Sequence, residues 1–254
     1  MEFDFYNWML AFVRVGAFLL ALPFFSAVNF PVMMRIALAA LAALMISPQL
    51  PAFSAAHLDL FSLIGLMFRE VSIGLLLGFM GRIIFYAVDI AGMIIASELG
   101  LSMGQIFDPA SHQSEQVPGV MLSLLAILTM LTLDLHHGLL LGFAKTFEVL
   151  PIGGGHLSPS LFELVVGRTA QIFSVALQIA APVMAVSFVI TVFFSIMSRA
   201  VPQMNVFAES FGIRIAGGLI VFGFTLQISA QYVANHLRRI PEDLVYIGQL
   251  LNGG

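Results

Sequence analysis

Long apolar runs separated by short polar segments constrain this chain more than any other feature of its sequence. Hydrophobic residues make up 60% of the chain and charged residues only 9%, whereas soluble domains carry about 25% charged residues. The 254 residues are enough for about five or six membrane-length helices of ~20 residues each. The sequence therefore predicts an all-α protein of the integral-membrane type.

Charge and composition exclude several classes of function. The net charge of −4 argues against a nucleic-acid-binding protein, which would present a basic patch. The chain has no cysteine, so it has neither a disulfide framework nor thiolate chemistry. The N-terminal residues are acidic, whereas a cleaved secretory signal begins with positive charge. We therefore expect the first apolar run to be retained as a helix.

The apolar runs predict where the helices lie. They cover approximately residues 8–25, 32–46, 61–96, 120–143, 169–198 and 206–232. The run 61–96 is too long for one simple membrane span and contains Gly74 and Gly78, a pair of small residues that permits close helix approach. A short amphipathic tail helix is expected after Pro241, with one apolar face made by Leu244, Ile247, Leu250 and Leu251.

A polar stretch, residues 97–118, interrupts the apolar pattern in the middle of the chain. Its side chains would lack hydrogen-bond partners in a lipid-facing helix, and the residues before Pro109 and Pro118 are biased away from helical conformation. The stretch is therefore predicted to be a long loop. Two interpretations stay open: the loop lines or blocks a pathway through an assembly, or it is an ordinary extramembrane connection.

Charged residues inside apolar helices are costly and normally face protein or water. Arg82 and Asp89 are seven residues apart, about 10 Å along a helix, so each is expected to meet a group on another helix. Inter-helix or inter-subunit contacts are favoured over an ion path for the whole set. That set is Arg14, Arg35, Arg69, Glu70, Arg82, Asp89 and Glu98.

No motif predicts an enzyme, a cofactor or a metal site. Asp134, His136 and His137 lack the i, i+4 spacing of a zinc-binding helix, and adjacent histidines are expected to point to different helix faces. Interfacial histidines are the preferred interpretation. The glycines at 153–155 predict a turn, because the Gly-Lys-Ser/Thr of a phosphate-binding loop does not follow them.

The polar turn at residues 199–207 resembles a family signature, Arg-x-x-Pro-Gln-x-Asn-x-Phe. This is the signature of the FliR family, whose members are export-apparatus proteins of the bacterial flagellum with relatives in type III secretion injectisomes. The residues that carry the resemblance are Arg199, Pro202, Gln203, Met204, Asn205 and Phe207.

Further positions are similar to the family pattern over essentially the whole chain. They include Arg14 in the first helix, Pro31 just before the second helix, Arg35 within the second helix, and Glu70 in the third. The tail at residues 237–243 is also similar. The resemblance implies a FliP-like N-terminal part, residues 1–118, and a C-terminal part, residues 119–254, which contains a FliQ-like helical hairpin at about 160–232 and the short tail helix.

The implied function is that of a core subunit of the flagellar type III secretion export gate. With FliP and FliQ it would form the channel for unfolded flagellar proteins across the bacterial inner membrane, in contact with FlhB, FlhA, the MS ring and the proximal rod of the basal body. The loop at about 105–118 is implied to plug this channel, with Ile106 and Phe107 as apolar blockers. The plug residues are Gln105, Ile106, Phe107, Asp108, Pro109, Ser111, His112, Gln113, Glu115 and Pro118.

Three alternatives remain at the level of the sequence. One is an injectisome export-gate subunit, and the weakest is an intramembrane enzyme that uses Asp134, His136 or Glu98. The third, from a different class, is a secondary transporter of a small solute, for which buried charges and broken helices would be suitable. That transporter would be expected to show an inverted repeat, and we find none in the sequence.

Overall fold

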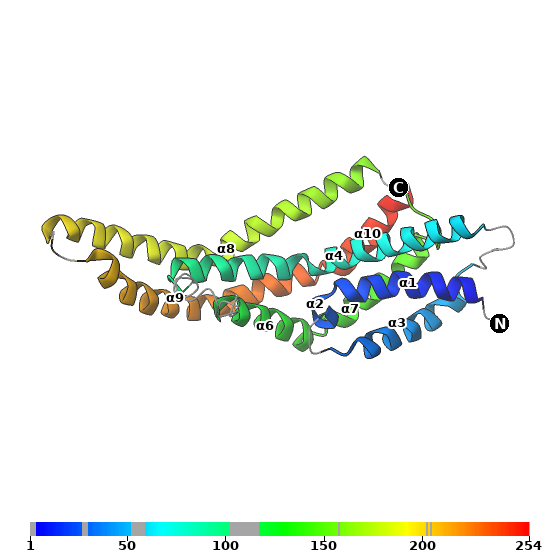
Figure 1. Cartoon of the computed structure of the whole chain (residues 1–254), viewed down its shortest axis with the longest axis horizontal. Coiled ribbons are helices and arrows are strands. Elements are labelled where there is room, and N and C mark those ends of the chain that lie inside the picture. Colours follow the sequence, from blue (N-terminus) through cyan, green and yellow to red (C-terminus); the bar gives the residue numbers. More distant parts are fainter. Residues whose placement is uncertain are drawn as a thin grey trace. The chain divides into compact units, whose positions relative to one another are not determined.

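The computed structural model describes residues 4–26, 30–51, 59–101, 117–156, 158–201, 203, 205 and 209–253, and the backbone of residues 206–208. Within these residues the secondary structure is helical and contains no strand, which confirms the all-α prediction (Figure 1). The helices are α1 (Phe5–Ala21), α2 (Pro23–Ser26), α3 (Val32–Ile46), η1 (Ser47–Gln49), α4 (Leu60–Glu98), α6 (Val117–Thr132), α7 (Leu135–Val149), α8 (Pro159–Ala200), α9 (Val206–Leu237) and α10 (Ile240–Leu251).

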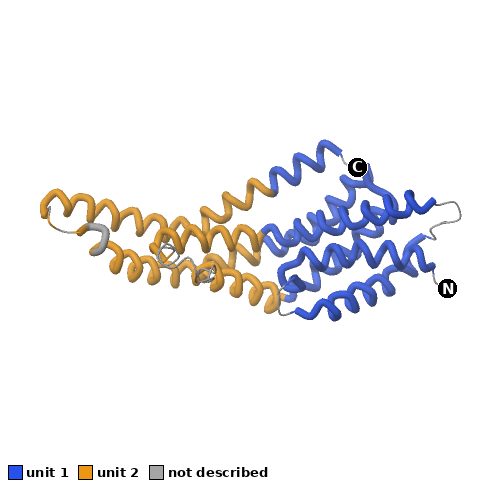
Figure 2. The backbone as a smooth tube through the Cα atoms, in the orientation of Figure 1, with its two compact units in different colours: residues 1–83, 134–168, 236–254 blue, residues 84–133, 169–235 orange. Residues whose placement is uncertain are grey.

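The chain divides into two compact units, each built from segments that are separated in the sequence (Figure 2). Unit 1 comprises residues 1–83, 134–168 and 236–254, and unit 2 comprises residues 84–133 and 169–235. The division falls inside α4, α8 and α9, so these three helices each contribute to both units.

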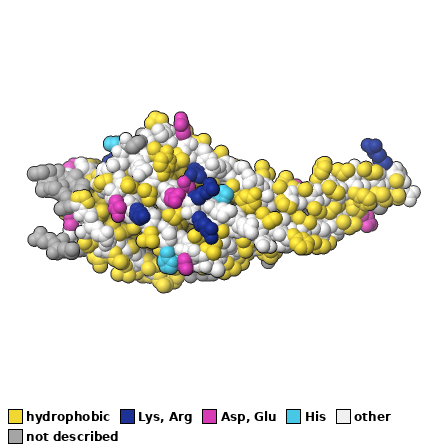
Figure 3. Space-filling view, turned by 180° about the vertical axis from the view of Figure 1, so that it is seen from behind, with side chains coloured by type: hydrophobic (Ala, Val, Ile, Leu, Met, Phe, Trp, Pro, Cys, Tyr) yellow, Lys and Arg dark blue, Asp and Glu magenta, His cyan; other side chains and the backbone are white. Residues whose placement is uncertain are grey.

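Several helices are long and apolar enough to cross a membrane. In the described residues they cover Val32–Gln49, Leu60–Glu98, Pro159–Ala200 and Glu209–Leu251, and α6 with α7 adds a fifth span if the two are counted together. Hydrophobic side chains are spread over the visible face among uncharged polar groups, and charged side chains are few (Figure 3). The fold is therefore that of an all-α membrane protein.

In unit 1, α1 begins at a capped end and crosses α4 at very short range. The Asp4 carboxylate accepts hydrogen bonds from the backbone N–H groups of Tyr6 and Asn7, at 3.0 and 3.3 Å, which is a standard helix N-cap. A Cβ added at Gly74 would overlap the carbonyl oxygen of Arg14, and one added at Gly78 would lie 2.8 Å from that of Phe18. The close approach predicted from the two glycines is confirmed.

The tail helix α10 packs against α7 within unit 1. A Cβ added at Gly142 of α7 would lie 2.7 Å from the Cα of Pro241, and one added at Gly248 of α10 would lie 2.8 Å from Val149. The predicted apolar face of this helix is confirmed, since its four members are buried: Leu244, Ile247, Leu250 and Leu251.

The apolar run at 120–143, predicted as one helix, is broken in the structure. Helix α6 ends at Thr132 and α7 begins at Leu135, and Asp134 between them has a left-handed backbone with φ 52° and ψ 23°. Aspartate tolerates this conformation better than most residues. The prediction of a single run was wrong because neither proline nor glycine marks the break.

In unit 2, α8 and α9 form an antiparallel hairpin whose turn lies between Ala200 and Val206. The Arg214 guanidinium of α9 donates to the Thr191 hydroxyl of α8 at 3.1 Å. Helix α4 ends beside this hairpin in a Schellman motif, in which the N–H of Gly100 bonds to the carbonyl of Ser97 and that of Leu101 bonds to Ala96.

Candidate functional site

A buried ion pair joins Arg14 of α1 to Glu70 of α4 within unit 1. Both side chains have no exposed surface. The Arg14 Nε donates to one carboxylate oxygen of Glu70, and its second terminal nitrogen donates to the other oxygen at 3.1 Å. This two-pronged geometry is the strong form of an arginine–carboxylate pair.

The end of α7 supplies the remaining partners of the Arg14 guanidinium. One terminal nitrogen donates to the carbonyl oxygen of Leu150 at 2.9 Å, and the other lies 3.4 Å from that of Pro151. Leu150 is the C-cap of α7, where carbonyl groups lack helical partners and the helix dipole favours a cation. The guanidinium also lies 4.4 Å from the ring centroid of Phe147, within the range of a cation–π contact.

The loop after α7 also binds the acidic member of the pair. The backbone N–H of Gly153 donates to the Glu70 carboxylate at 2.9 Å. The carbonyl of the same glycine accepts a hydrogen bond from the neighbouring Arg69 guanidinium at 2.8 Å. Two adjacent charged residues of α4 are therefore bonded to the backbone N–H and the backbone carbonyl of the same residue, Gly153.

These contacts join α1, α4 and the loop at 150–153 through charge-assisted hydrogen bonds. Removing one partner of a buried ion pair costs about 3–5 kcal/mol, because the other charge is left uncompensated. The charged groups of Arg14 and Glu70 are bonded to each other and to backbone groups of the loop, which is the arrangement of a structural clamp. We call the three charged residues that make these contacts the clamp: Arg14, Arg69 and Glu70.

Two other helix charges also contact neighbouring helices. The Arg82 guanidinium donates to the Ser26 hydroxyl of α2 at 3.3 Å, within unit 1. The Ser123 hydroxyl of α6 donates to the Asp89 carboxylate at 2.5 Å, within unit 2. Beside the second contact, a Cβ at Gly92 would overlap the backbone of Gly119, so α4 and α6 also approach at short range.

Arg35 and Glu98 are placed differently. Both are half-buried. The Arg35 Nε is buried and has no hydrogen-bond partner among the described residues. The backbone carbonyl of Glu98 contacts a neighbouring helix: it accepts a hydrogen bond from the Ser187 hydroxyl of α8 at 3.3 Å.

The predicted plug and the signature turn lie mainly outside the described residues. Of the plug residues, Gln105, Ile106, Phe107, Asp108, Pro109, Ser111, His112, Gln113 and Glu115 are not described, and Pro118 is buried at the start of α6. Of the signature turn, Pro202, Met204 and the side chain of Phe207 are likewise not described. The remaining turn residues, Arg199, Gln203 and Asn205, are exposed.

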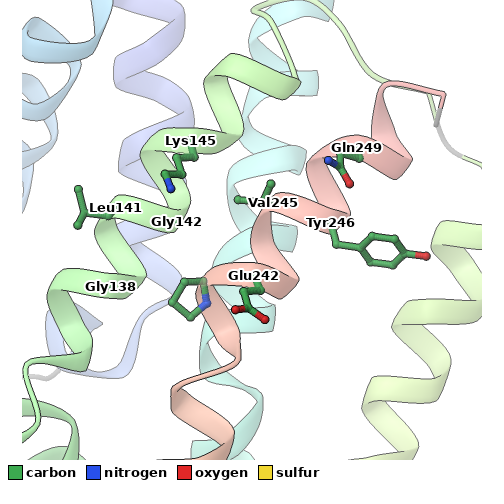
Figure 4. A pocket seen from close by; sticks show the side chains of 9 residues that line it. Gly138, Leu141, Gly142, Lys145, Glu242, Val245, Tyr246 and Gln249 are labelled. Carbon is green, nitrogen blue, oxygen red and sulfur yellow. The ribbon is translucent and has the colours of Figure 1, made fainter.

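A shallow pocket of about 500 Å³ lies between α7 and α10 in unit 1 (Figure 4). Lys145 of α7 and Glu242 of α10 flank it, with Tyr246 and Gln249 further along α10 (Figure 4). Its lining contains no serine, histidine or cysteine, so it lacks the Ser–His or Cys–His pair of a hydrolytic site.

Sequence reasoning missed the loop partners of the clamp and the acidic partner in one half-buried ion pair. Leu150 and Gly153 act through backbone atoms, which no side-chain pattern marks. The only available signal was that a proline and three glycines directly follow a helix end, where unpaired carbonyls are expected. The ion pair joins Arg168 of α8 to Asp243 of α10 at 2.6 Å.

Apolar helices with exposed hydrophobic faces and a buried Arg–Glu clamp define a multi-helix membrane protein. The chain belongs to the bacterial export proteins, family 1, whose family model matches residues 5–240. The resemblance to the FliR family inferred from the signature turn is thereby confirmed, and the chain has a role in the export apparatus.

Curated relatives with the name flagellar biosynthetic protein FliR match most of the chain. The Escherichia coli protein is 30% identical over 227 residues, which cover 89% of this chain and 86% of that protein. The Bacillus subtilis protein is 28% identical over 230 residues, which cover 89% of this chain and 88% of that protein. The protein from Buchnera aphidicola of Schizaphis graminum is 27% identical over 242 residues, covering 94% and 93%.

Proposed function

We propose that this chain is a core, non-enzymatic subunit of the flagellar type III secretion export gate. In this proposal it assembles with FliP-like and FliQ-like subunits into the channel through which unfolded flagellar proteins cross the inner membrane. Membership of the export family supports the general role. The observation that supports assembly with other subunits is the large number of hydrophobic side chains that the chain exposes.

Helix α3 illustrates this uncovered surface in unit 1. Only Ala39 and Ala43 of this helix are buried. Large hydrophobic side chains are exposed elsewhere around it, including Met33 at 82% and Met45 at 75%. A helix that buries only two alanines against its own chain and exposes most of its large apolar side chains needs lipid or partner helices on its other sides. The FliP-like subunits of the proposal would supply such helices.

The hairpin of α8 and α9 shows the same property in unit 2. Exposed hydrophobic side chains occur along both helices: Phe173, Leu177, Phe188, Val189, Val192, Phe193 and Ile196 on α8, and Ile213, Leu219, Ile220, Phe224 and Ile228 on α9. Two-helix hairpins of this kind can stack through such faces. This is the basis for proposing FliQ-like subunits as neighbours and for treating the hairpin as the FliQ-like part.

The loop at 105–118 is proposed to close the channel at rest. A closed gate needs an apolar constriction that disfavours water and ions, and Ile106 and Phe107 provide apolar side chains within an otherwise polar segment. The complex is further proposed to lie in the basal body, in contact with FlhA-like and FlhB-like proteins, the MS ring and the proximal rod.

Native mass spectrometry tests the proposal. The chain would be co-expressed with its FliP-like and FliQ-like candidates and purified through a tag on this chain. We expect one large complex that holds this chain with several copies of both partners. A stable monomer or homodimer that ignores both partners would refute the proposal and favour a small-solute transporter. Assembly with injectisome partners in preference to flagellar ones would assign the chain to an injectisome.

A further inference from the structure

Three potential metal ligands come together at the first turn of α7, in unit 1. Asp134, His136 and His137 each present one ligand atom, and these atoms all lie within 4.8 Å of one another. The His137 Nδ1 lies 3.6 Å from a carboxylate oxygen of Asp134, and the two imidazole rings are 4.1 Å apart between centroids. The expectation that the adjacent histidines point to different faces was wrong, because the two rings lie beside each other and one ligand atom of each lies within 4.8 Å of the Asp134 carboxylate.

The break between α6 and α7 creates this geometry. Asp134 is the N-cap of α7 in a left-handed conformation, and its side chain makes no capping hydrogen bond. Its carboxylate is therefore available to the histidines instead of to the helix N–H groups. In a regular helix Asp134 and His137, three positions apart, would share a face, but His136, two positions from Asp134 and one from His137, would not lie with them.

An unsatisfied nitrogen provides a second, independent observation. The Nδ1 atom of His136 is buried and has no hydrogen-bond partner among the described residues. A buried ring nitrogen without a partner is unfavourable, and each such group in a folded protein calls for a physical explanation. Coordination to a metal ion would supply the missing partner.

We propose that Asp134, His136 and His137 form a binding site for a divalent transition metal of the zinc class. Two imidazoles and one carboxylate are ligands that Zn²⁺ and its neighbours prefer. Metal–ligand bonds of about 2.0–2.2 Å require donors roughly 3.3–3.5 Å apart, so the three side chains must close slightly. They can do so because the side chains of Asp134 and His137 are 78% and 67% exposed.

The exposure also determines the kind of site. Three protein ligands on an open surface leave at least one coordination position for water or for a side chain of another subunit. The positive end of the α7 dipole opposes a cation, and the Asp134 carboxylate offsets that field. The metal would stabilise the start of α7 and the left-handed residue before it. This inference concerns unit 1 alone and does not depend on the proposed channel.

Zinc binding to the full-length chain in detergent tests the inference. The chain would carry a tag without histidines, and Zn²⁺ would be titrated by calorimetry in the absence of other ligands. We expect one equivalent per chain. Co²⁺ in place of Zn²⁺ should give the intense visible absorption of a four- or five-coordinate site.

Matched variants make the result specific. His137→Gln and Asp134→Asn each remove one ligand at an exposed position, and we expect each to weaken binding by at least the ~10–100-fold that loss of a supporting contact to a metal ligand costs. His156→Gln replaces an exposed histidine outside the cluster and should bind as the unmodified chain does. Absence of stoichiometric binding, or equal binding by all four proteins, would overturn the proposal.

Discussion

At the scale of single residues, the free-energy cost of burying the two charges of the Arg14–Glu70 pair is offset by several hydrogen bonds and a cation–π contact. Arg14 and Glu70 lose all contact with water, which costs several kcal/mol for each ion. The carbonyl of Leu150, the N–H of Gly153 and the ring of Phe147 offset that cost with directed contacts. The ion pair therefore holds three segments together: α1, α4 and the loop at 150–153.

A mutant cycle on the pair gives the first prediction. Glu70→Gln leaves the Arg14 charge buried without its counterion, and we expect it to lower the free energy of unfolding by about 3–5 kcal/mol. The double variant Arg14→Met with Glu70→Leu should cost less than the sum of Arg14→Met alone and Glu70→Leu alone, because neither charge remains in the double variant. Thermal unfolding of the purified chain in detergent measures both effects.

The control for this cycle is Glu163→Gln, which removes an exposed glutamate from the first part of α8. It should change the free energy of unfolding by no more than about 0.5 kcal/mol. If Glu70→Gln were as mild as Glu163→Gln, the clamp would not stabilise the fold.

At the scale of helices, short-range crossings depend on glycine. Gly74 lies one turn beyond Glu70, and its missing side chain lets α4 approach the backbone of Arg14. The close crossing and the ion pair occur at the same place, because Gly74 lies against the backbone of Arg14, the residue that pairs with Glu70. A pair of equivalent substitutions on α4 separates this effect from helix propensity.

Gly74→Ala is predicted to destabilise the chain by about 1–3 kcal/mol, since the added methyl group forces α1 and α4 apart. Gly65→Ala makes the same change on the same helix, where a Cβ would meet nothing within 4 Å. It should be neutral or stabilising by up to about 1 kcal/mol, the gain in helix propensity. Equal melting temperatures for the two variants would contradict the crossing.

The helices themselves were largely predictable from the sequence, because apolar runs with polar or proline-marked ends show where a helix starts and stops. The turn before Val206 and the tail helix after Arg239 are examples. The break at Asp134 was not predictable, since an aspartate between apolar residues also fits a continuous helix. Nor was the pairing of Arg14 with Glu70, which are 56 positions apart, because hydrophobic periodicity does not say which helices are neighbours.

At the scale of the whole molecule, buried and exposed faces of one helix should respond differently to the same substitution. Phe222 and Phe224 of α9 are 3% and 78% exposed. Phe222→Ala should destabilise the isolated chain by about 3–5 kcal/mol. Phe224→Ala should leave the stability of the isolated chain nearly unchanged and weaken its assembly with partner subunits.

The expected size of the second effect follows from the apolar surface that a phenylalanine buries in an interface. Burial of such a side chain contributes about 1.5–3 kcal/mol, which corresponds to a change of roughly 10- to 100-fold in the dissociation constant. Recovery of the tagged complex at decreasing protein concentration measures this change. A Phe224→Ala complex as persistent as the unmodified one would mean that lipid, not protein, covers this face.

Deletion of the proposed plug tests the closed state of the assembled gate. If residues 105–115 are replaced by a short Gly-Ser linker, the apolar constriction is lost and ion conductance through complexes in planar bilayers should rise, because water is no longer excluded. The replacement should stop before Val117, since Pro118 is buried and the backbone of Gly119 lies against Gly92. A deletion that included these residues would disturb α4 and α6 and could open a leak for an unrelated reason. Complexes that carry Gly65→Ala serve as the control, and conductance that stays at their level after the replacement would show that this loop does not seal the channel.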